Sequence, residues 1–283
     1  MPIALVLEGG AKRGIYTAGV LDVFLENGIR ADAVFGVSAG AIHGCSYVSN
    51  QYGRSIRYNL KYGNDSRFMS IKNWIKTGNV VDTDFCYHEL PEKLDIFDHV
   101  TFEKSKTKFY AVCSNIETGK AELIHCSSLR GDKINYLRAS ASLPFFSKIV
   151  EIEGKKLLDG GICDSIPLKA VQQLGFDKNV VVLTRPLGYR KKPSFNRWLA
   201  NIVYRKFPQF VKAILYRHNM YNNELDYINE QKKLGKTIVI QPSQPFKIAR
   251  MEKDLNKVKA MYEMGRCDAL AIIDKVKAFI SEA

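Results

Sequence analysis

A serine between two glycines, where an apolar run meets a run of small residues, is the first candidate for chemistry in this chain. The segment VFGVSAGAIHG, residues 34–44, places Ser38 between Gly36 and Gly40 in a Gly-x-Ser-x-Gly pattern. A serine at the tip of a strand–turn–helix is exposed and lies near the positive end of a helix dipole. The pattern makes Ser38 a candidate nucleophile, and a small residue in an ordinary tight turn is the alternative.

A glycine-rich loop, LEGGAKRG, stands between the first apolar run and the first helical segment. Such loops direct backbone N–H groups at an anion. A nucleotide P-loop is excluded because isoleucine and tyrosine follow Gly14, where that motif has Lys and Ser or Thr. A dinucleotide fingerprint lacks its second glycine at Ala11, although Asp32 stands near the expected acidic position. The third interpretation is an oxyanion hole for the alkoxide formed when Ser38 attacks an acyl carbon.

The proton of Ser38 needs an acceptor, and the conventional order in hydrolases is serine, then acid, then histidine. His218 is the only histidine late enough for this order, and it stands in a basic, aromatic segment. His43 lies on a poorly matched face of the helix after Ser38, so we expect a packed or capping residue. The alternative is Asp159, which ends a strand-like run before two glycines. Because Asp-Gly commonly starts a turn, these residues alone leave the base undecided.

Strand-like runs alternate with helical segments, which predicts a mostly parallel sheet covered by helices. We therefore expect an α/β fold, a three-layer α/β/α sandwich with a parallel-rich central sheet. Without repeats or a low-complexity linker, residues 1–283 are expected to form one domain, with a motif-bearing core at about 1–185 and further helices in 186–283. The predicted elements are strands at 3–7, 31–37, 178–186 and 236–242, hairpins at 108–126 and 149–161, and helices at 16–29, 39–50 and 251–280.

Composition narrows the classes of partner. The formal net charge of +13 favours an anionic partner, either nucleic acid, an acidic lipid surface or an acidic protein. The six cysteines are widely spaced without a Cys-x-x-Cys pair, which argues against a zinc ribbon and favours a reducing compartment. The first residues predict a strand and not a signal peptide, because Glu8 interrupts the apolar run that a signal peptide requires. We expect a cytoplasmic protein with no membrane span, no metal and no organic cofactor.

A basic, aromatic segment follows the motif-bearing core, with no acidic residue between Asp177 and Glu224. From residue 196 the pattern predicts an amphipathic helix interrupted at Pro208. The segment is either a helix packed on the core, a nucleic-acid surface, or an interfacial helix on anionic lipid. It carries no recognisable DNA- or RNA-binding motif, so no nucleic acid is expected. The candidate membrane contacts are Arg190, Lys191, Lys192, Arg197 and Trp198.

The motifs GGAKRG, GVSAG and DGG, in this order and at these intervals, resemble those of the bacterial patatin-like phospholipase family. Residues 139–168 also resemble the family's segment leading into its catalytic aspartate. Members of that family are lipid acyl hydrolases that use a Ser–Asp dyad and no catalytic histidine. The resemblance implies that Ser38 is the nucleophile and that Asp159 activates first the serine and later the attacking water.

The same resemblance assigns the glycine loop. Its backbone amides are expected to form the oxyanion hole, and its residues are Gly9, Gly10, Ala11, Arg13 and Gly14. Ala11 stands where the family usually has a third glycine, and a positive φ there costs alanine about 1 kcal/mol or more. Arg13 matches the family's basic position and orients the loop or meets an anionic group. The glycines expected in the serine turn and the aspartate motif are Gly36, Gly40, Gly160 and Gly161.

Taken together, these features predict an enzyme that hydrolyses carboxylic esters of phospholipids or related acyl lipids. An acyl lipid is the expected substrate, and an anionic surface on the inner face of the membrane is the expected peripheral partner. Two alternatives remain open. One is a conventional esterase that uses His218 in a triad, and the other is a non-catalytic lipid-binding or regulatory module.

Overall fold

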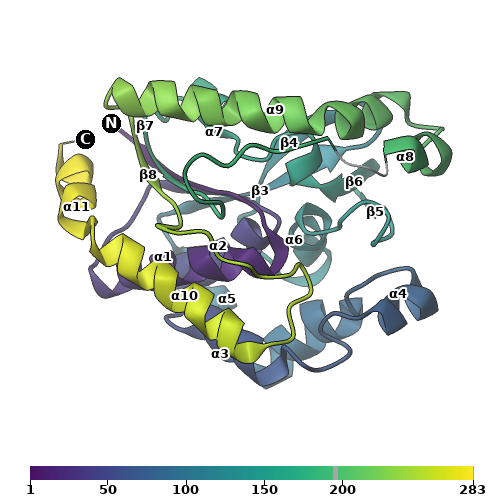
Figure 1. Cartoon of the computed structure of the whole chain (residues 1–283). Coiled ribbons are helices and arrows are strands. Elements are labelled where there is room, and N and C mark those ends of the chain that lie inside the picture. The colour runs from purple at the N-terminus through teal and green to yellow at the C-terminus, as the bar shows by residue number, and fades with distance from the viewer. Residues whose placement is uncertain (194–196, 283) are drawn as a thin grey trace.

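The structure, a computed structural model, describes residues 1–193 and 197–282, and a sheet with helices against both faces forms its centre (Figure 1). The α/β/α arrangement predicted from the sequence is confirmed. The eight described strands are β1 (Ile3–Leu7), β2 (Ala33–Val37), β3 (Lys108–Asn115), β4 (Lys120–His125), β5 (Val150–Ile152), β6 (Lys155–Asp159), β7 (Lys178–Val182) and β8 (Thr237–Ile240).

Five of these strands are parallel, in the order β3-β2-β1-β7-β8, and the two predicted hairpins add antiparallel strands. β4 covers one edge of β3. The other edge carries β2 as far as the pair Val37–Val112, and β6 takes over at the pair Cys113–Asp159. This register sets the end of β6 directly beside the turn that follows β2.

Helices cover both faces of the sheet (Figure 1). On one side lie α1 (Ile15–Glu26), α2 (Ala39–Val48), α3 (Arg54–Tyr62) and α10 (Leu255–Leu270), and on the other α7 (Leu168–Gln173) and α9 (Pro208–Lys233). Around them are α4 (Ile71–Thr77), α5 (His99–Lys104), α6 (Ile134–Ser140), α8 (Arg197–Val203) and α11 (Ile273–Ser281). Shorter helical segments are the 3₁₀ turns η1 (Ala11–Gly14), η3 (Gly131–Lys133) and η4 (Gly160–Ile162), and the π-helical η2 (Phe85–Leu94).

Alternate strand residues divide between two apolar layers. In β1, Leu5 and Leu7 belong to the core cluster under α1 and α2, whereas Ala4 and Val6 belong to the cluster under α7 and α9. Strands of a parallel sheet covered on both faces show this near-continuous apolar character. With both faces buried, the ends of the strands are where the sheet can present polar groups to a ligand.

The C-terminal helix α10 packs closely along α1. A Cβ at Gly19 would lie 2.2 Å from the carbonyl oxygen of Tyr262, and a Cβ at Gly265 would lie 2.1 Å from that of Tyr16. Glycine is therefore required on both helices for this approach. The Tyr262 hydroxyl also donates to Asp22 at 2.7 Å in the same interface. The C-terminal helices are thus joined to the first helix of the motif-bearing core.

The basic, aromatic segment forms two helices, α8 and α9. The predicted interruption at Pro208 is confirmed, because this proline is the first residue of α9. Proline suits the first position of a helix, where its missing N–H would have no partner anyway. Residues 194–196, which include Phe195 of this segment, lie outside the described residues. Within 1–193 and 197–282, no helix is long and apolar enough to cross a membrane.

Candidate active site

Ser38 occupies the sharp turn between β2 and α2. Its φ of 54° and ψ of −119° are a strained conformation for a residue with a side chain. The neighbouring glycines permit the turn. A Cβ at Gly36 would lie 2.4 Å from Cα of Ala41, and a Cβ at Gly40 would lie 2.4 Å from the carbonyl oxygen of Leu7. The turn holds the serine at the carboxyl edge of the parallel strands.

The Ser38 hydroxyl donates a hydrogen bond of 2.6 Å to Oδ2 of Asp159. The other carboxylate oxygen, Oδ1, accepts the Gly161 amide at 2.8 Å. Both side chains are buried, with exposed fractions of 7% for the serine and 2% for the aspartate. A Cβ at Gly160 would lie 2.2 Å from the carbonyl oxygen of Val112, so glycine is required for the chain to turn here. The structure thus brings the predicted serine and aspartate together.

Burial raises the pKa of the Asp159 carboxyl above its ordinary value, whereas the hydrogen bond from Ser38 and the charge of Arg217 lower it. A raised pKa makes the carboxylate a better proton acceptor at the pH where it is ionised. Arg217 comes from α9, and its Nε donates to the carbonyl of Gly161. No sequence motif indicates this arginine, because the packing of α9 brings it to the site.

The histidine alternative finds no geometric support among the described residues. His218 makes no hydrogen bond to Ser38 or to Asp159, whose oxygens accept the serine hydroxyl and a backbone amide. His43 is buried on α2, as expected for a packed residue. Burial, and then nearby cationic side chains, lower its pKa to about 3 and keep the ring neutral.

The glycine loop lies directly against the serine. A Cβ at Gly9 would come within 2.8 Å of the Ser38 Cβ, so this position accepts only glycine. Within the described part of the chain, the amides of Gly9 and Gly10 donate to no backbone or side-chain acceptor. Unpaired amides beside a buried serine hydroxyl are what an oxyanion hole requires.

Ala11 opens the short turn η1 with a φ of 48°. This left-handed conformation is the one that disfavours alanine and favours the glycine usual in the family. Arg13 continues the turn, and its amide donates to the carbonyl of Gly10 at 3.1 Å. A Cβ at Gly14 would lie 2.4 Å from the Cβ of Ala39, which ties the loop to the first residue of α2.

A second serine supports the turn. Ser140 Oγ accepts the amide of Ser38 at 2.9 Å and donates to the carbonyl of Val112 at 2.7 Å. Ser140 is fully buried at the end of α6. Ser140 belongs to none of the three motifs. Its only signal is a position within residues 139–168, the stretch that resembles the family's approach to its aspartate.

A pocket of about 830 Å³ opens beside Ser38, a volume typical of small-molecule sites. Its lining is mainly apolar and includes Ile15, Ile42, Phe68, Leu90, Phe97 and Leu137. Lys12 also lines it, and its Nζ donates to Oδ1 of Asn59 at 2.9 Å. Burial, followed by the charge of Lys253, lowers the pKa of Lys12 to about 8. The pocket suits an apolar chain whose polar end lies at the serine.

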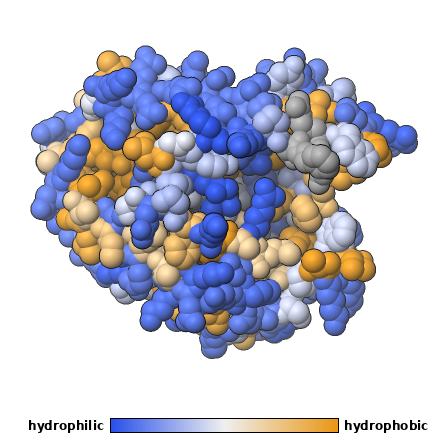
Figure 2. Space-filling view, viewed as in Figure 1, coloured by the Kyte–Doolittle hydropathy of each residue, from blue (hydrophilic) through white to orange (hydrophobic). Residues whose placement is uncertain are grey.

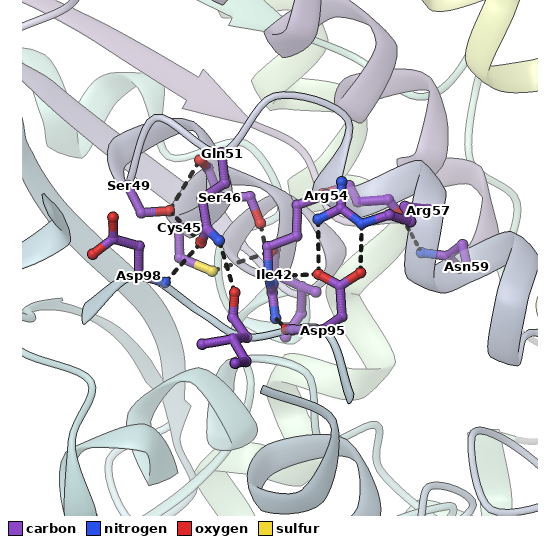
Figure 3. A network of polar contacts seen from close by, with 12 residues as sticks. Ile42, Cys45, Ser46, Ser49, Gln51, Arg54, Arg57, Asn59, Asp95 and Asp98 are labelled. Carbon is purple, nitrogen blue, oxygen red and sulfur yellow. Dashed lines mark hydrogen bonds and ion pairs between the residues drawn. The ribbon is translucent and has the colours of Figure 1, made fainter. Parts of the chain in front are cut away.

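A polar network holds one wall of this pocket, the segment 95–98 between η2 and α5 (Figure 3). Asp95 accepts two hydrogen bonds from Arg57, at 2.7 and 2.9 Å, and one of its oxygens lies 3.4 Å from Nε of Arg54. Gln51 holds the same segment by donating to the carbonyl of residue 96 and accepting the amide of residue 98. The charged pairs therefore fix the pocket wall to α3.

Two of the candidate membrane contacts, Trp198 and Lys192, are exposed and have no described partner. Trp198 on α8 has an exposed fraction of 61%, and Ile202 on the same helix has 59%. Lys192 is exposed in the segment before α8. The side chain of Arg197 lies outside the described residues. Trp198 and Lys192 are thus the members of the predicted set that face solvent without a described partner.

The other two candidates have partners inside the molecule. Arg190 is exposed but forms an ion pair with Asp226 on α9. Lys191 is partly buried, and its Nζ lies 4.4 Å from the ring centroid of Tyr221. Burial, and then neighbouring positive charges, lower the pKa of Lys191 to about 7. Lys191 therefore faces the interior near the strand ends.

Residues 5–171, which contain both Ser38 and Asp159, match the family model of the patatin-like phospholipases. This chain belongs to the patatin-like phospholipase family. The resemblance based on the three motifs is confirmed, and so is the patatin-like fold. Membership also confirms the expected class of enzyme, a lipid acyl hydrolase. Residues 207–281 match a second family model, described as a domain of unknown function (DUF6363).

Individual relatives of this patatin-like chain differ in how much of it they cover. An uncharacterized protein of Escherichia coli, YjjU, is 26% identical over 274 residues, which are 93% of this chain and 75% of YjjU. Lysophospholipase NTE1 of Saccharomyces cerevisiae is 30% identical over 179 residues, which are 61% of this chain but only 10% of that protein. The solved structure of VipD from Legionella pneumophila aligns with a TM-score of 0.49 at 12% identity, over 97% of this chain and 67% of that one.

Proposed function

We propose that this chain hydrolyses carboxylic esters of phospholipids or related acyl lipids through an acyl-serine intermediate. Ser38 is the nucleophile and Asp159 is the base. The observation that carries the proposal is the 2.6 Å hydrogen bond from the serine hydroxyl to a buried carboxylate. The family match and the lysophospholipase relatives support the substrate class.

In the first half of the reaction, Ser38 Oγ attacks the ester carbonyl carbon and Asp159 Oδ2 accepts the hydroxyl proton. The bond to the leaving alcohol then breaks, and the alcohol departs with the proton from the aspartate. In the second half, Asp159 takes a proton from water, which attacks the acyl-serine. The fatty acid leaves and the proton returns to Ser38 Oγ. The cycle involves no metal and no organic cofactor.

The loop amides, in this proposal, stabilise the negative charge on the carbonyl oxygen. Gly9 and Gly10 lie beside the serine with unpaired N–H groups, and the turn through Ala11, Arg13 and Gly14 sets their direction. One such donor typically contributes on the order of 10²–10³ in kcat. The acyl chain occupies the apolar pocket beside Ser38.

We also propose that residues 1–283 act as one hydrolase domain that works in the cytoplasm and binds an anionic membrane surface peripherally. The close packing of α10 on α1 supports the single domain. The net charge of +13 and the exposed Trp198 support the membrane partner.

A fluorophosphonate probe tests the chemistry because it reports an activated serine without the natural substrate. We expect the wild type to be labelled, Ser38→Ala to be unlabelled, Asp159→Asn to be labelled more slowly and His218→Ala to be labelled normally. Thermal unfolding of each variant checks that it is folded. Loss of labelling in folded His218→Ala, with normal labelling of Asp159→Asn, would replace the dyad with a histidine triad. An unlabelled, folded wild type would favour a non-catalytic lipid-binding module.

A further inference from the structure

The charges of five basic side chains interact near the carboxyl ends of β1, β7 and β8, and none of the five lines the apolar pocket. They come from the glycine loop, the segment after β7, helix α9 and the loop before α10. In Figure 1 this last loop crosses the front of the molecule between α9 and α10, and Figure 2 shows hydrophilic side chains in the middle of this face. These five side chains, here called the cationic cluster, are Arg13, Arg185, Lys191, Arg217 and Arg250.

Aromatic rings hold part of the cluster in place. Arg185 lies 4.4 Å from the ring centroid of Tyr189, and Lys191 lies 4.4 Å from that of Tyr221. The two rings meet edge to face, with centroids 5.9 Å apart. The Tyr221 hydroxyl donates to Glu8 at 2.8 Å, which anchors the ring at the end of β1. Arg185 and Lys191 are held near the glycine loop in this way without an ion pair to a described carboxylate.

The cluster has an excess of positive charge. None of its five members forms an ion pair with a described residue. The Nε of Arg13 is buried without a hydrogen-bond partner. Three carboxylates, Glu8, Asp159 and Glu224, act on Arg217 and reduce the excess. All three already accept hydrogen bonds within the protein.

The members of the cluster act on one another. Burial, and then the charge of Arg185, lower the pKa of Arg13, and Arg250 contributes in the same direction. Burial, and then the charge of Arg217, lower the pKa of Lys191. Neighbouring positive charges repel one another, and an anion bound between them would relieve this repulsion. Arg217 also lies against Gly161, which places this excess charge beside the dyad.

We propose that the cationic cluster binds the phosphate of the lipid headgroup while the acyl chain lies in the apolar pocket. The inference rests on the proposed function and names its substrate class, acyl glycerol lipids that end in a phosphate monoester. Such a group carries close to two negative charges at neutral pH and offers three acceptor oxygens to the arginines. A choline headgroup is disfavoured because its quaternary ammonium would face the same five cations.

This assignment gives the C-terminal region a role. Arg217 and Arg250 lie within residues 207–281, the part of the chain that matches a domain of unknown function. The family model of the patatin-like phospholipases ends at residue 171, and only Arg13 of the cluster lies inside it. The region from 207 to 281 therefore supplies headgroup recognition to a hydrolytic centre built by the earlier part of the chain.

Substrate comparison tests the proposal. We expect kcat/KM for 1-acyl-glycerol-3-phosphate to exceed that for the phosphocholine and the neutral monoacylglycerol of the same chain length by on the order of tenfold or more. Arg250 is exposed, so Arg250→Gln should fold normally and reduce this preference by on the order of tenfold. Lys212→Gln removes the same charge from an exposed position on α9 and should keep the preference.

The outcomes separate this inference from the proposed function. A wild type that hydrolyses all three lipids equally, with dependence on Ser38, would overturn headgroup recognition and leave the hydrolase intact. Equal losses of preference in Arg250→Gln and Lys212→Gln would show a general charge effect and also overturn it. If added inorganic phosphate alters hydrolysis of the neutral lipid while the three lipids remain equivalent, the cluster binds free phosphate instead. A folded enzyme that hydrolyses no lipid and takes no fluorophosphonate label would contradict the proposed function itself.

Discussion

At the scale of single residues, the proposed reaction depends on a buried carboxylate that must be ionised to accept a proton. Burial raises the pKa of Asp159, so activity should be lost on acidification at a higher pH than an ordinary aspartate, with its pKa of 3.8, would give. Arg217 opposes this shift because its positive charge favours the carboxylate. Its removal should therefore move the acid limb of the pH profile to still higher pH.

The measurement is kcat/KM against pH for Arg217→Gln and the wild type. A neutral ester substrate keeps headgroup binding out of the comparison. Lys212→Gln serves as the control, because it removes a positive charge from α9 at an exposed position. An acid limb that stays in place or moves to lower pH in Arg217→Gln would contradict this account of Asp159.

Ala11 is a second residue whose backbone allows a prediction. Its φ of 48° costs an alanine about 1–2 kcal/mol, and glycine avoids this cost. Glycine also gains more freedom in the unfolded chain, which offsets about 0.4–1 kcal/mol of the benefit. Ala11→Gly should thus raise the free energy of unfolding by about 0.5–1 kcal/mol, measured in urea, and retain fluorophosphonate labelling. Ala11→Val should lower it, and a more stable valine variant would show that φ is not the controlling factor.

The site residues that belong to sequence motifs differ physically from those that belong to none. Ser38 and the loop glycines belong to local patterns because the backbone requires those residue types at those spacings, whereas Asp159 was assigned through the resemblance to the family. Ser140 and Arg217 belong to no such pattern, since their contacts arise from the packing of α6 and α9 against the strand ends. No local pattern encodes a contact whose two sides are distant in the chain.

At the scale of elements, the strands were predictable because short apolar runs bounded by glycine or proline are typical of buried strands. Their order was not. Hydrophobic periodicity predicts a buried hairpin at residues 149–161, but it does not show with which strand of the sheet the hairpin pairs. The pairing of β6 with the end of β3, immediately past β2, is what brings Asp159 to the serine turn. The dyad is a consequence of strand register.

The pocket wall offers an element-scale prediction. Arg54 and Asp95 are both buried, with side-chain exposed fractions of 5% each. Asp95→Ala leaves this arginine without a counter-charge and should lower the free energy of unfolding by about 3–5 kcal/mol. Asp65→Ala removes one of the two carboxylate partners of the half-exposed Arg67, which keeps Glu89, and should cost about 1 kcal/mol or less. Urea unfolding measures both, and equal losses would contradict a structural role for the buried pair.

At the scale of the whole molecule, the net charge predicts an anionic partner but not where it binds. The basic, aromatic segment contains side chains of two kinds, which face in different directions in the structure. Lys191 turns inward to the strand ends, whereas Trp198 and Ile202 face solvent on α8. On α4, Ile75 is also exposed, and Figure 1 places α4 and α8 at the same end of the molecule. The composition of the segment does not show which side chains face inward and which face solvent, so this difference could not be predicted from it.

This end of the molecule is where the proposed peripheral membrane contact should be strongest. The indole of Trp198 is suited to the headgroup region of a bilayer, and Lys192 lies nearby in the chain to meet anionic lipid. Vesicles rich in phosphatidylglycerol should bind the protein more tightly than phosphatidylcholine vesicles. Binding should weaken as salt rises, since the screening length is about 10 Å at 0.1 M.

Trp198→Ala should then weaken sedimentation with anionic vesicles by about tenfold or more, because interfacial burial of a large aromatic side chain contributes about 1.5–3 kcal/mol. The control is Leu234→Ala, since this leucine has the same exposed fraction of 61% and follows the far end of α9. The net charge is the same in both variants, so a difference between them reports the position of the apolar side chain. Equal binding by Trp198→Ala and Leu234→Ala would move the membrane contact away from α8. Attraction by the overall charge alone would then be sufficient to explain any binding that remained.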